Sequence, residues 1–145
     1  MSDQTIESII GGQFPKRVIP LIDEAHQTIK IVVFDWRWYP NDPGNPVQLF
    51  NQALVRAVRR GVVVQAVTNV VAIQKFLIDN GIRAKQFISK GIVHAKLMIL
   101  DGKHVVLGSH NYTQYGFSKN QELSVLMLNC DDVQQYVSFF NGLWT

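Results

Sequence analysis

The chain has 145 residues, and its 14 Lys and Arg against 11 Asp and Glu give a net charge of +3 at pH 7. An apolar content of 47% supports a hydrophobic core, and with 17% charged residues the composition excludes a disordered tail. The single cysteine, Cys130, excludes an internal disulfide and a thiolate metal cluster. No run approaches the roughly 18 consecutive apolar residues of a membrane helix. We therefore expect one domain over residues 1–145, and a cytoplasmic location because residues 1–4 lack the pattern of a signal peptide.

Two hydrophobic periodicities alternate over the first part of the chain. Apolar residues at helical spacing predict helices, one of which begins at Pro46, a favoured first helical residue, and ends before Gly61. Dense β-branched runs between them predict strands buried on both faces, as is typical of parallel sheets. The expected order is a helix over residues 15–27, a strand over Ile29–Trp36, a helix from Pro46 to about Arg60, a strand over Val62–Val67, a helix over residues 70–80 and a strand over Ile82–Phe87.

The pattern changes after Gly91. The dipeptide Asp101-Gly102 suits a tight hairpin turn, so the strands on either side of it are expected to be neighbours. The whole order predicts an α/β fold in which a mixed, largely parallel sheet is sandwiched between helices. The remaining expected elements are strands over Ile92–Leu100 and His104–Leu107, a polar loop over residues 108–117 that enters a short helix, a strand over Gln121–Leu128 and a final helix capped by Asp131 or Asp132.

The residues best suited to chemistry follow this change of pattern. On a strand, alternate side chains share a face, so His94 and Lys96 are expected to project together, about 7 Å apart. An imidazole beside a permanent cation suits attack on phosphorus while the phosphate oxygens are neutralised. The turn after the next strand brings the Ser109 hydroxyl and the Asn111 amide toward the same anion. Glu122 is expected to accept a hydrogen bond from His94 and so fix its tautomer.

Together these residues form a recognisable motif. The spacing His-x-Lys-x4-Asp at His94, Lys96 and Asp101, followed by Gly-Ser-x-Asn at residues 108–111, resembles the signature of the phospholipase D superfamily. The short chain and the single copy of the motif are similar to the small bacterial endonuclease branch of that superfamily. The resemblance implies a phospholipase D-like fold and the hydrolysis of phosphodiester bonds.

The resemblance also implies a role for each residue of the site. His94 would be the nucleophile that forms a covalent phosphohistidine. Lys96 and Asn111 would bind the phosphate oxygens, and Ser109 would support that pocket. Glu122 would orient His94.

Four residues outside this set are candidates for other roles. Asp101 lies at the hairpin end of its strand and is interpreted as a structural part of the motif, making a turn or inter-strand hydrogen bond. Arg37 and Trp38 follow an expected parallel strand, on the usual ligand side of open α/β sheets, where a guanidinium and an aromatic ring suit phosphates and bases. Packing in the core or in a dimer interface explains Trp38 equally well. His110 lies between two site residues, where it either touches the substrate or points outward.

The implied mechanism uses two histidines, one neutral to attack and one protonated to give the leaving oxygen a proton. Because the chain carries the motif once, we expect a homodimer whose twofold axis brings two His94 side chains to one site. Two lysines then supply the positive charge that a divalent metal would provide, and the sequence has no His-Glu-x-x-His motif or cysteine pair. We therefore expect no cofactor and no metal ligands.

Three functions are compatible with these residues. The first is a metal-independent phosphodiesterase that cuts nucleic acid, with DNA favoured by the mild positive charge. The second is hydrolysis of a phospholipid head group, which the superfamily also performs. The sequence has no basic amphipathic helix or lipidation motif, so stable membrane association is not expected. The third is a non-catalytic DNA-binding module with a degraded site, although every residue of the motif is present.

Overall fold

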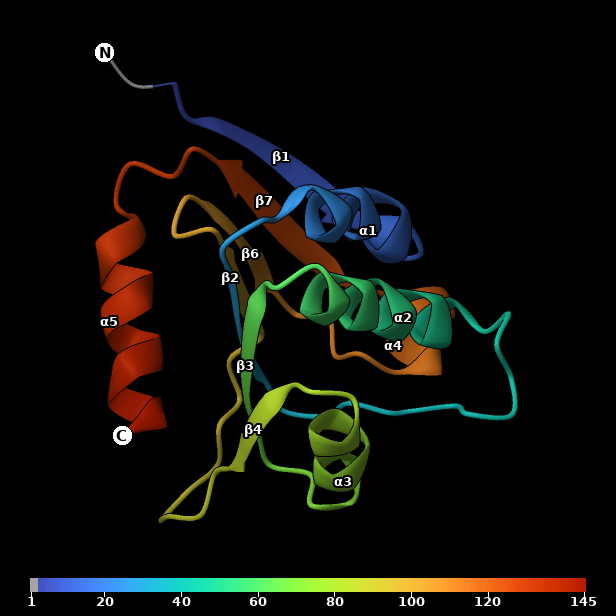
Figure 1. Ribbon diagram of the computed structural model, residues 1–145. Helices are drawn as coiled ribbons and strands as arrows, with labels where there is room; N and C mark the ends of the chain where they lie inside the picture. Colours follow the sequence, from blue (N-terminus) through green and yellow to red (C-terminus); the bar gives the residue numbers. More distant parts are fainter. Residues whose placement is uncertain (1–2) are drawn as a thin grey trace.

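A seven-stranded sheet forms the centre of the protein in a computed structural model that describes residues 3–145 (Figure 1). Residues 1 and 2, part of the start of the chain considered above, lie outside the described residues. The order of the strands across the sheet is β1-β7-β6-β5-β2-β3-β4. The strands are β1 (Thr5–Ile10), β2 (Thr28–Val33), β3 (Val63–Thr68), β4 (Arg83–Gln86), β5 (Leu97–Leu100), β6 (His104–Gly108) and β7 (Leu123–Leu128). The helices are α1 (Gln13–Glu24), α2 (Pro46–Arg59), α3 (Ala72–Asp79), α4 (Gln114–Ser118) and α5 (Val133–Trp144).

The sheet is mixed, as predicted, and the α/β fold class is confirmed, but the prediction that it is largely parallel is wrong. Only β2–β3 and β3–β4 pair in parallel, while the other four of the six pairings are antiparallel. After β4 the chain crosses to the other side of β2 and returns as the antiparallel strand β5. All four residues of β5 are buried, so a continuous apolar run reports burial on both faces and not the direction of the neighbouring strand.

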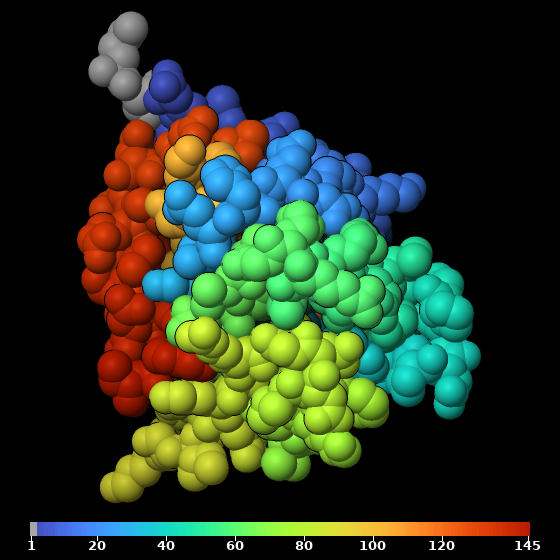
Figure 2. Space-filling model, viewed as in Figure 1, coloured from blue at the N-terminus to red at the C-terminus, as the bar shows by residue number. Residues whose placement is uncertain are grey.

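Helices cover both faces of the sheet, as predicted, and divide the interior into two cores. The larger core lies between the sheet and the helices α1, α2, α3 and α4. In Figure 2 this side of the molecule is on the right, and α5 is on the left. The smaller core lies under α5, which packs alone on the opposite face (Figure 1). Neighbouring residues of β2 alternate between them, since Ile31 belongs to the larger core and Val32 to the smaller one.

Strand β1 was not predicted. It pairs antiparallel with β7 at the edge of the sheet, and Ile9 is its only buried residue. An edge strand with a mostly exposed surface carries a weak apolar pattern, which explains why the sequence analysis began with the first helix.

The strand predicted over Ile92–Leu100 is shorter, because only Leu97–Leu100 are extended as β5. In the segment before β5, the Asn69 side chain makes the hydrogen bonds to Val93 that a neighbouring strand would otherwise make. Its amide nitrogen donates to the Val93 carbonyl (2.5 Å), and its amide oxygen accepts from the Val93 N–H (3.2 Å). His94 and Lys96 therefore lie in an irregular segment that leads into the sheet.

Within residues 3–145, none of the helices combines the length and the apolar character that crossing a bilayer requires.

Candidate active site

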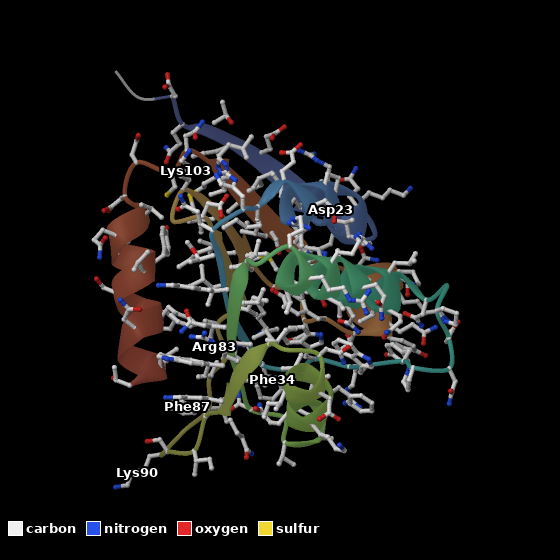
Figure 3. All side chains as sticks on the ribbon, in the orientation of Figure 1. Asp23, Phe34, Arg83, Phe87, Lys90 and Lys103 are labelled. Carbon is white, nitrogen blue, oxygen red and sulfur yellow. The ribbon has the colours of Figure 1, made fainter. Side chains whose placement is uncertain are left out.

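His94 and Lys96 meet at the point where the irregular segment enters β5. The Lys96 ammonium lies 3.4 Å from Nδ1 and 3.3 Å from Nε2 of the His94 ring. Phe34, which follows β2 and is labelled in Figure 3, packs against both: its ring centre is 5.7 Å from that of His94 and 5.9 Å from the Lys96 ammonium. His94 is exposed and Lys96 is half-buried. The two side chains thus occupy one spot at the surface, although they do not share a strand face.

The electrostatics of Lys96 connect it to the start of β7. Partial burial lowers the pKa of the Lys96 ammonium below its ordinary value, and the nearby Glu122 carboxylate opposes this shift. Glu122 therefore favours the charged form of Lys96, and an ammonium in this form can bind an anion.

Ser109 and Glu122 form a hydrogen-bonded pair beside this cation. The Ser109 hydroxyl donates to a Glu122 carboxylate oxygen (2.5 Å) and accepts from the Leu123 N–H (2.9 Å). The Asn120 amide donates to the other Glu122 oxygen (3.1 Å). Across residues 3–145 the Glu122 carboxylate makes no hydrogen bond to His94, so the expected orientation of the imidazole by Glu122 is absent in this state. Instead, Glu122 holds Ser109 and acts electrostatically on Lys96.

Gly108 allows this pair to form. A Cβ atom at Gly108 would lie 2.3 Å from the Ser124 Cα and 2.6 Å from the Leu123 carbonyl oxygen, both backbone atoms. Only glycine therefore lets the end of β6 approach β7 so closely. The Gly108 N–H also donates to the Lys96 carbonyl (3.2 Å), which connects this turn to the segment that carries His94 and Lys96.

Asn111 is held by the segment that follows Phe34. Its side-chain oxygen accepts from the Asp35 N–H (3.0 Å), and no other residue of the described chain bonds to its amide nitrogen. With the oxygen engaged, the NH₂ group is the part of the amide that can donate to a bound anion. Asp35, like Asn69, was missed by the sequence analysis, because a residue that acts through its position beside another has no spacing motif.

His110 is not a substrate-binding residue. It is 1% exposed, it stacks on Phe14 with 4.6 Å between ring centres, and its Nε2 lies 2.9 Å from the Gly11 carbonyl oxygen. A carbonyl only accepts, so Nε2 donates and Nδ1 accepts from the Ser124 hydroxyl (2.7 Å). Burial lowers the pKa of His110, opposed by the Gly11 hydrogen bond and by Glu122. Both expectations for His110, contact with the substrate and an outward side chain, are wrong because its partners are brought in by long-range pairing.

Asp101 lies at the turn between β5 and β6, at the far end of β5 from His94. Its carboxylate accepts hydrogen bonds from the N–H groups of His26, Gln27 and Thr28, at distances from 2.8 to 3.2 Å. Burial by itself raises the pKa of this carboxyl, but the three backbone hydrogen bonds and the nearby His26 ring together lower the pKa below its ordinary value of 3.8. The residue fastens the hairpin to the start of β2.

Arg37 and Trp38 lie beyond Asp35 on the same loop. The Arg37 guanidinium makes a two-point ion pair with the Asp35 carboxylate (2.9 and 3.2 Å), and the side chain is 59% exposed. Trp38 is half-buried and stacks on Phe76, with 6.0 Å between the ring centres and 8° between the planes. Arg37 therefore faces solvent near Asn111, whereas Trp38 has a packing role against α3.

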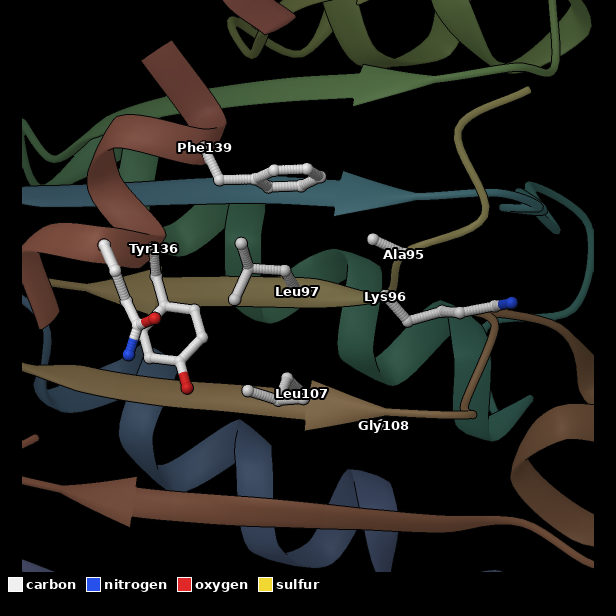
Figure 4. Close-up of a pocket in the computed structure, with 8 residues that line it drawn as sticks. Ala95, Lys96, Leu97, Leu107, Gly108, Tyr136 and Phe139 are labelled. Atoms are coloured by element: carbon white, nitrogen blue, oxygen red, sulfur yellow. The ribbon is translucent and has the colours of Figure 1, made fainter. Parts of the chain in front are cut away.

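A hollow of about 410 Å³ borders Lys96 on the side of the sheet that α5 covers (Figure 4). Tyr136 and Phe139 of α5 and Leu97 and Leu107 of the sheet line it, while the Lys96 side chain extends away at its edge. In the described part of the chain, no three His, Cys, Asp or Glu side chains gather in an arrangement that could hold a metal ion.

Comparison with known proteins places this arrangement in a family. The family described as "Cardiolipin synthase, PLD-like domain" matches residues 18–144. The chain is similar to Nuc, a phospholipase D family member from Salmonella typhimurium, with a TM-score of 0.82 and 22% identity over 98% of this chain and 95% of that one. It is also similar to NucT from Helicobacter pylori, with a TM-score of 0.76 and 17% identity over 98% and 96% of the two chains.

A curated relative is the rat protein "5'-3' exonuclease PLD3", 27% identical over 139 residues, which are 86% of this chain and 28% of the relative. The chain thus spans less than a third of that protein. The match over residues 18–144 shows that the chain belongs to the phospholipase D-like domain family of the phospholipase D superfamily. The resemblance drawn from the motif is confirmed.

Proposed function

We propose that this protein is a metal-independent phosphodiesterase that hydrolyses nucleic acid, and DNA in particular, through a covalent phosphohistidine. The observation that carries the proposal is the contact of 3.3–3.4 Å between the Lys96 ammonium and the ring nitrogens of His94, which puts a nucleophile and a cation at one accessible spot. The family supports phosphodiester chemistry, and the name of the rat relative, an exonuclease, supports nucleic acid as the substrate.

In the proposed reaction, a nitrogen of neutral His94 forms a bond to phosphorus while the bond from phosphorus to the leaving alcohol oxygen breaks. Lys96 and the free NH₂ group of Asn111 bind the two non-bridging oxygens, where negative charge gathers in the transition state. An imidazolium gives its proton to the leaving oxygen. In the second step that imidazole takes a proton from water, whose oxygen attacks phosphorus and releases His94.

We further propose that the second imidazole is His94 of another copy of the chain, because one ring cannot attack and protonate on opposite sides of phosphorus. A partly uncovered face of the sheet supports a homodimer. Ile6, Ile10 and Leu123 are 62%, 61% and 57% exposed on β1 and β7, and Leu123 pairs directly with Ile10. These three residues lie on the α5 side of the sheet, beyond the area that α5 covers. Contact with a second copy of the chain would bury this apolar surface and so stabilise a dimer.

Phospholipid hydrolysis is the second candidate, and one observation favours it. The hollow beside Lys96 is lined mostly by apolar side chains, and such a lining accommodates an acyl chain next to a phosphate group (Figure 4). The third candidate, a non-catalytic DNA-binding module, predicts DNA binding without turnover.

One experiment separates the three candidates. Purified protein is incubated with plasmid DNA and with vesicles of phosphatidylglycerol, each in excess EDTA. We expect nicked and linear plasmid with intact lipid. Plasmid cleavage that appears only after Mg²⁺ is added contradicts the metal-independent mechanism, head-group release establishes the phospholipid candidate, and retarded but uncut plasmid establishes the binding module.

A further inference from the structure

A second hollow lies next to Asn111, between the loop that follows β2 and the segment that leads from β6 into the start of α4. It has a volume of about 310 Å³ and is lined by Asp35, Arg37, Tyr39, Thr113, Gln114 and Tyr115. It is separate from the apolar hollow under α5, with which it shares no lining residue. Polar and aromatic groups make up its wall, so it suits a ligand that is flat, polar at its edges and partly charged.

Backbone hydrogen bonds fasten this hollow to the proposed phosphate site. The Tyr112 N–H donates to the Asp35 carbonyl (3.1 Å), and the Arg37 N–H donates to the Tyr112 carbonyl (3.0 Å). Between them, Trp36 and Tyr112 are buried and meet edge to face. The Asp35 N–H orients the Asn111 amide, as described above. The two segments are therefore joined into one unit. This unit carries Asn111, which is proposed to bind the phosphate, and also the wall of the hollow.

The side chains of the hollow match the chemistry of a nucleotide. The Tyr115 ring is 59% exposed, and the Lys119 ammonium lies 5.3 Å from its centre. The Tyr39 hydroxyl, close to the Gln114 N–H (3.4 Å), belongs to the same wall. Arg37 uses two N–H groups on Asp35, and its remaining donors are free to meet a phosphate. Exposed aromatic rings beside cations are the combination that binds single-stranded nucleic acid, because bases stack and phosphates pair.

We propose that this hollow is a subsite for one unpaired nucleotide next to the scissile phosphate; this rests on the proposed function. The base stacks on Tyr115, and the phosphate of the same nucleotide meets Arg37. A base within a duplex is paired and stacked on its neighbours, so it does not reach Tyr115 without being extruded. The protein therefore cuts both forms of DNA, but it binds single strands more tightly and cuts them faster than duplexes.

Tyr115 variants test the subsite on two substrates, a labelled single-stranded DNA oligonucleotide and a strand of the same length made of tetrahydrofuran abasic residues. Tyr115→Leu keeps bulk but removes the aromatic face, and it should weaken binding and kcat/KM for the oligonucleotide about tenfold. Tyr115→Phe should restore both values. Turnover of the abasic strand, which has phosphodiester bonds but no aromatic ring to stack, should change less than twofold in either variant. Equal losses on both substrates, or an unchanged oligonucleotide affinity, overturn the subsite.

Measurements of oligonucleotide binding test the subsite independently of cleavage. If the wild-type protein cuts neither substrate, the proposed function fails, while fluorescence anisotropy with the same oligonucleotide still compares Tyr115→Leu with Tyr115→Phe. An oligonucleotide with one abasic position should bind wild-type protein about tenfold more weakly than the intact one, and this difference should vanish in Tyr115→Leu. A difference that persists in the variant, or a Tyr115→Leu protein that loses self-association in sedimentation, assigns Tyr115 to another role and overturns the proposal.

Discussion

In the proposed mechanism, turnover depends most directly on His94, which forms the bond to phosphorus, and on Lys96, which binds the phosphate oxygens. We predict that His94→Ala and Lys96→Ala each reduce plasmid cleavage in EDTA by about a thousandfold or more. His94 is exposed and Lys96 is half-buried, so the unfolding midpoint should change little.

Lys103→Ala is the matched control for the charge. Lys103 lies in the turn between β5 and β6, at the opposite end of the sheet from Phe34 (Figure 3). Its loss should leave cleavage within about twofold of wild type. If His94→Ala cleaves plasmid at a rate near that of wild type, His94 is not the nucleophile.

Asp101 illustrates the opposite case, a motif residue that acts on stability. Its lowered pKa means that the ionised form is stabilised in the folded state, so this contribution is present above the ordinary value of 3.8 and is lost as pH falls through the folded-state pKa. Asp101→Asn should reduce the free energy of unfolding by about 1–3 kcal/mol at pH 7, because an NH₂ group replaces an oxygen that accepts backbone hydrogen bonds.

Urea unfolding at pH 7 and at pH 3 measures this difference, which should shrink at the lower pH. Asp79→Asn, which removes an exposed carboxylate paired with Lys75, is the control and should show no such pH dependence. A loss of catalysis in Asp101→Asn at unchanged stability contradicts the structural role.

At the scale of elements, the approach of β6 to β7 controls where Ser109 and Glu122 meet. Gly108→Ala places a methyl group within 2.3–2.6 Å of Ser124 and Leu123 backbone atoms, so the strands must separate. Overpacking of this kind costs about 1–3 kcal/mol or more. We predict a lower unfolding midpoint. We also predict reduced cleavage, because Ser109 is the next residue in the chain and would move away from Glu122.

Gly142→Ala provides the contrast within the same chain. No atom lies within 4 Å of the added methyl group, and the residue is within α5, so alanine should stabilise the protein by about 0.5–1 kcal/mol. Calorimetry of both variants measures the two changes in unfolding midpoint, which should have opposite signs. A Gly108→Ala protein as stable and as active as wild type shows that the two strands have room to adjust.

The helices and most of the strands were predictable because each has a local apolar pattern, as α2 shows from Pro46 to Arg59. Strand direction was not predictable, because the pattern of a buried strand such as β5 is the same for parallel and antiparallel neighbours. The candidate site residues were selected by their spacing alone, and the structure brings His94 and Lys96 into contact. The contacts around these residues could not be predicted, because they depend on pairing between distant segments. His110 is buried by contacts with Gly11 and Ser124, and Val93, next to His94, is bound by the Asn69 side chain.

For the whole molecule, the proposed shared site makes a strong prediction about mixed subunits. Wild-type protein is equilibrated with a roughly tenfold excess of His94→Ala subunits, so that most wild-type subunits are in heterodimers. If both histidines serve one site, activity should fall to about a tenth of that of the same amount of wild type alone. An excess of Lys103→Ala subunits should cause no such loss. Activity proportional to the wild-type subunits contradicts the shared site.

The apolar face on β1 and β7 gives the matching test by substitution. Leu123→Glu puts a charge on the proposed interface and should shift the sedimenting species toward the monomer, with a parallel loss of cleavage. An active monomer refutes the dimer mechanism. An inactive protein that remains dimeric places the interface elsewhere.

The pairing of β1 with β7 has a consequence for how the chain reaches its native state. As a nascent chain leaves the ribosome, β2, β3 and β4 become available early, and their parallel pairing with α2 and α3 as crossovers needs no later segment. The other edge of β2 stays open until β5 is synthesised, and β1 waits for β7. His94, Lys96, Ser109, Asn111 and Glu122 all belong to this late half. The residues of the proposed active site are therefore brought together late, and the unpaired edge of β2 is the surface that a chaperone has most reason to protect.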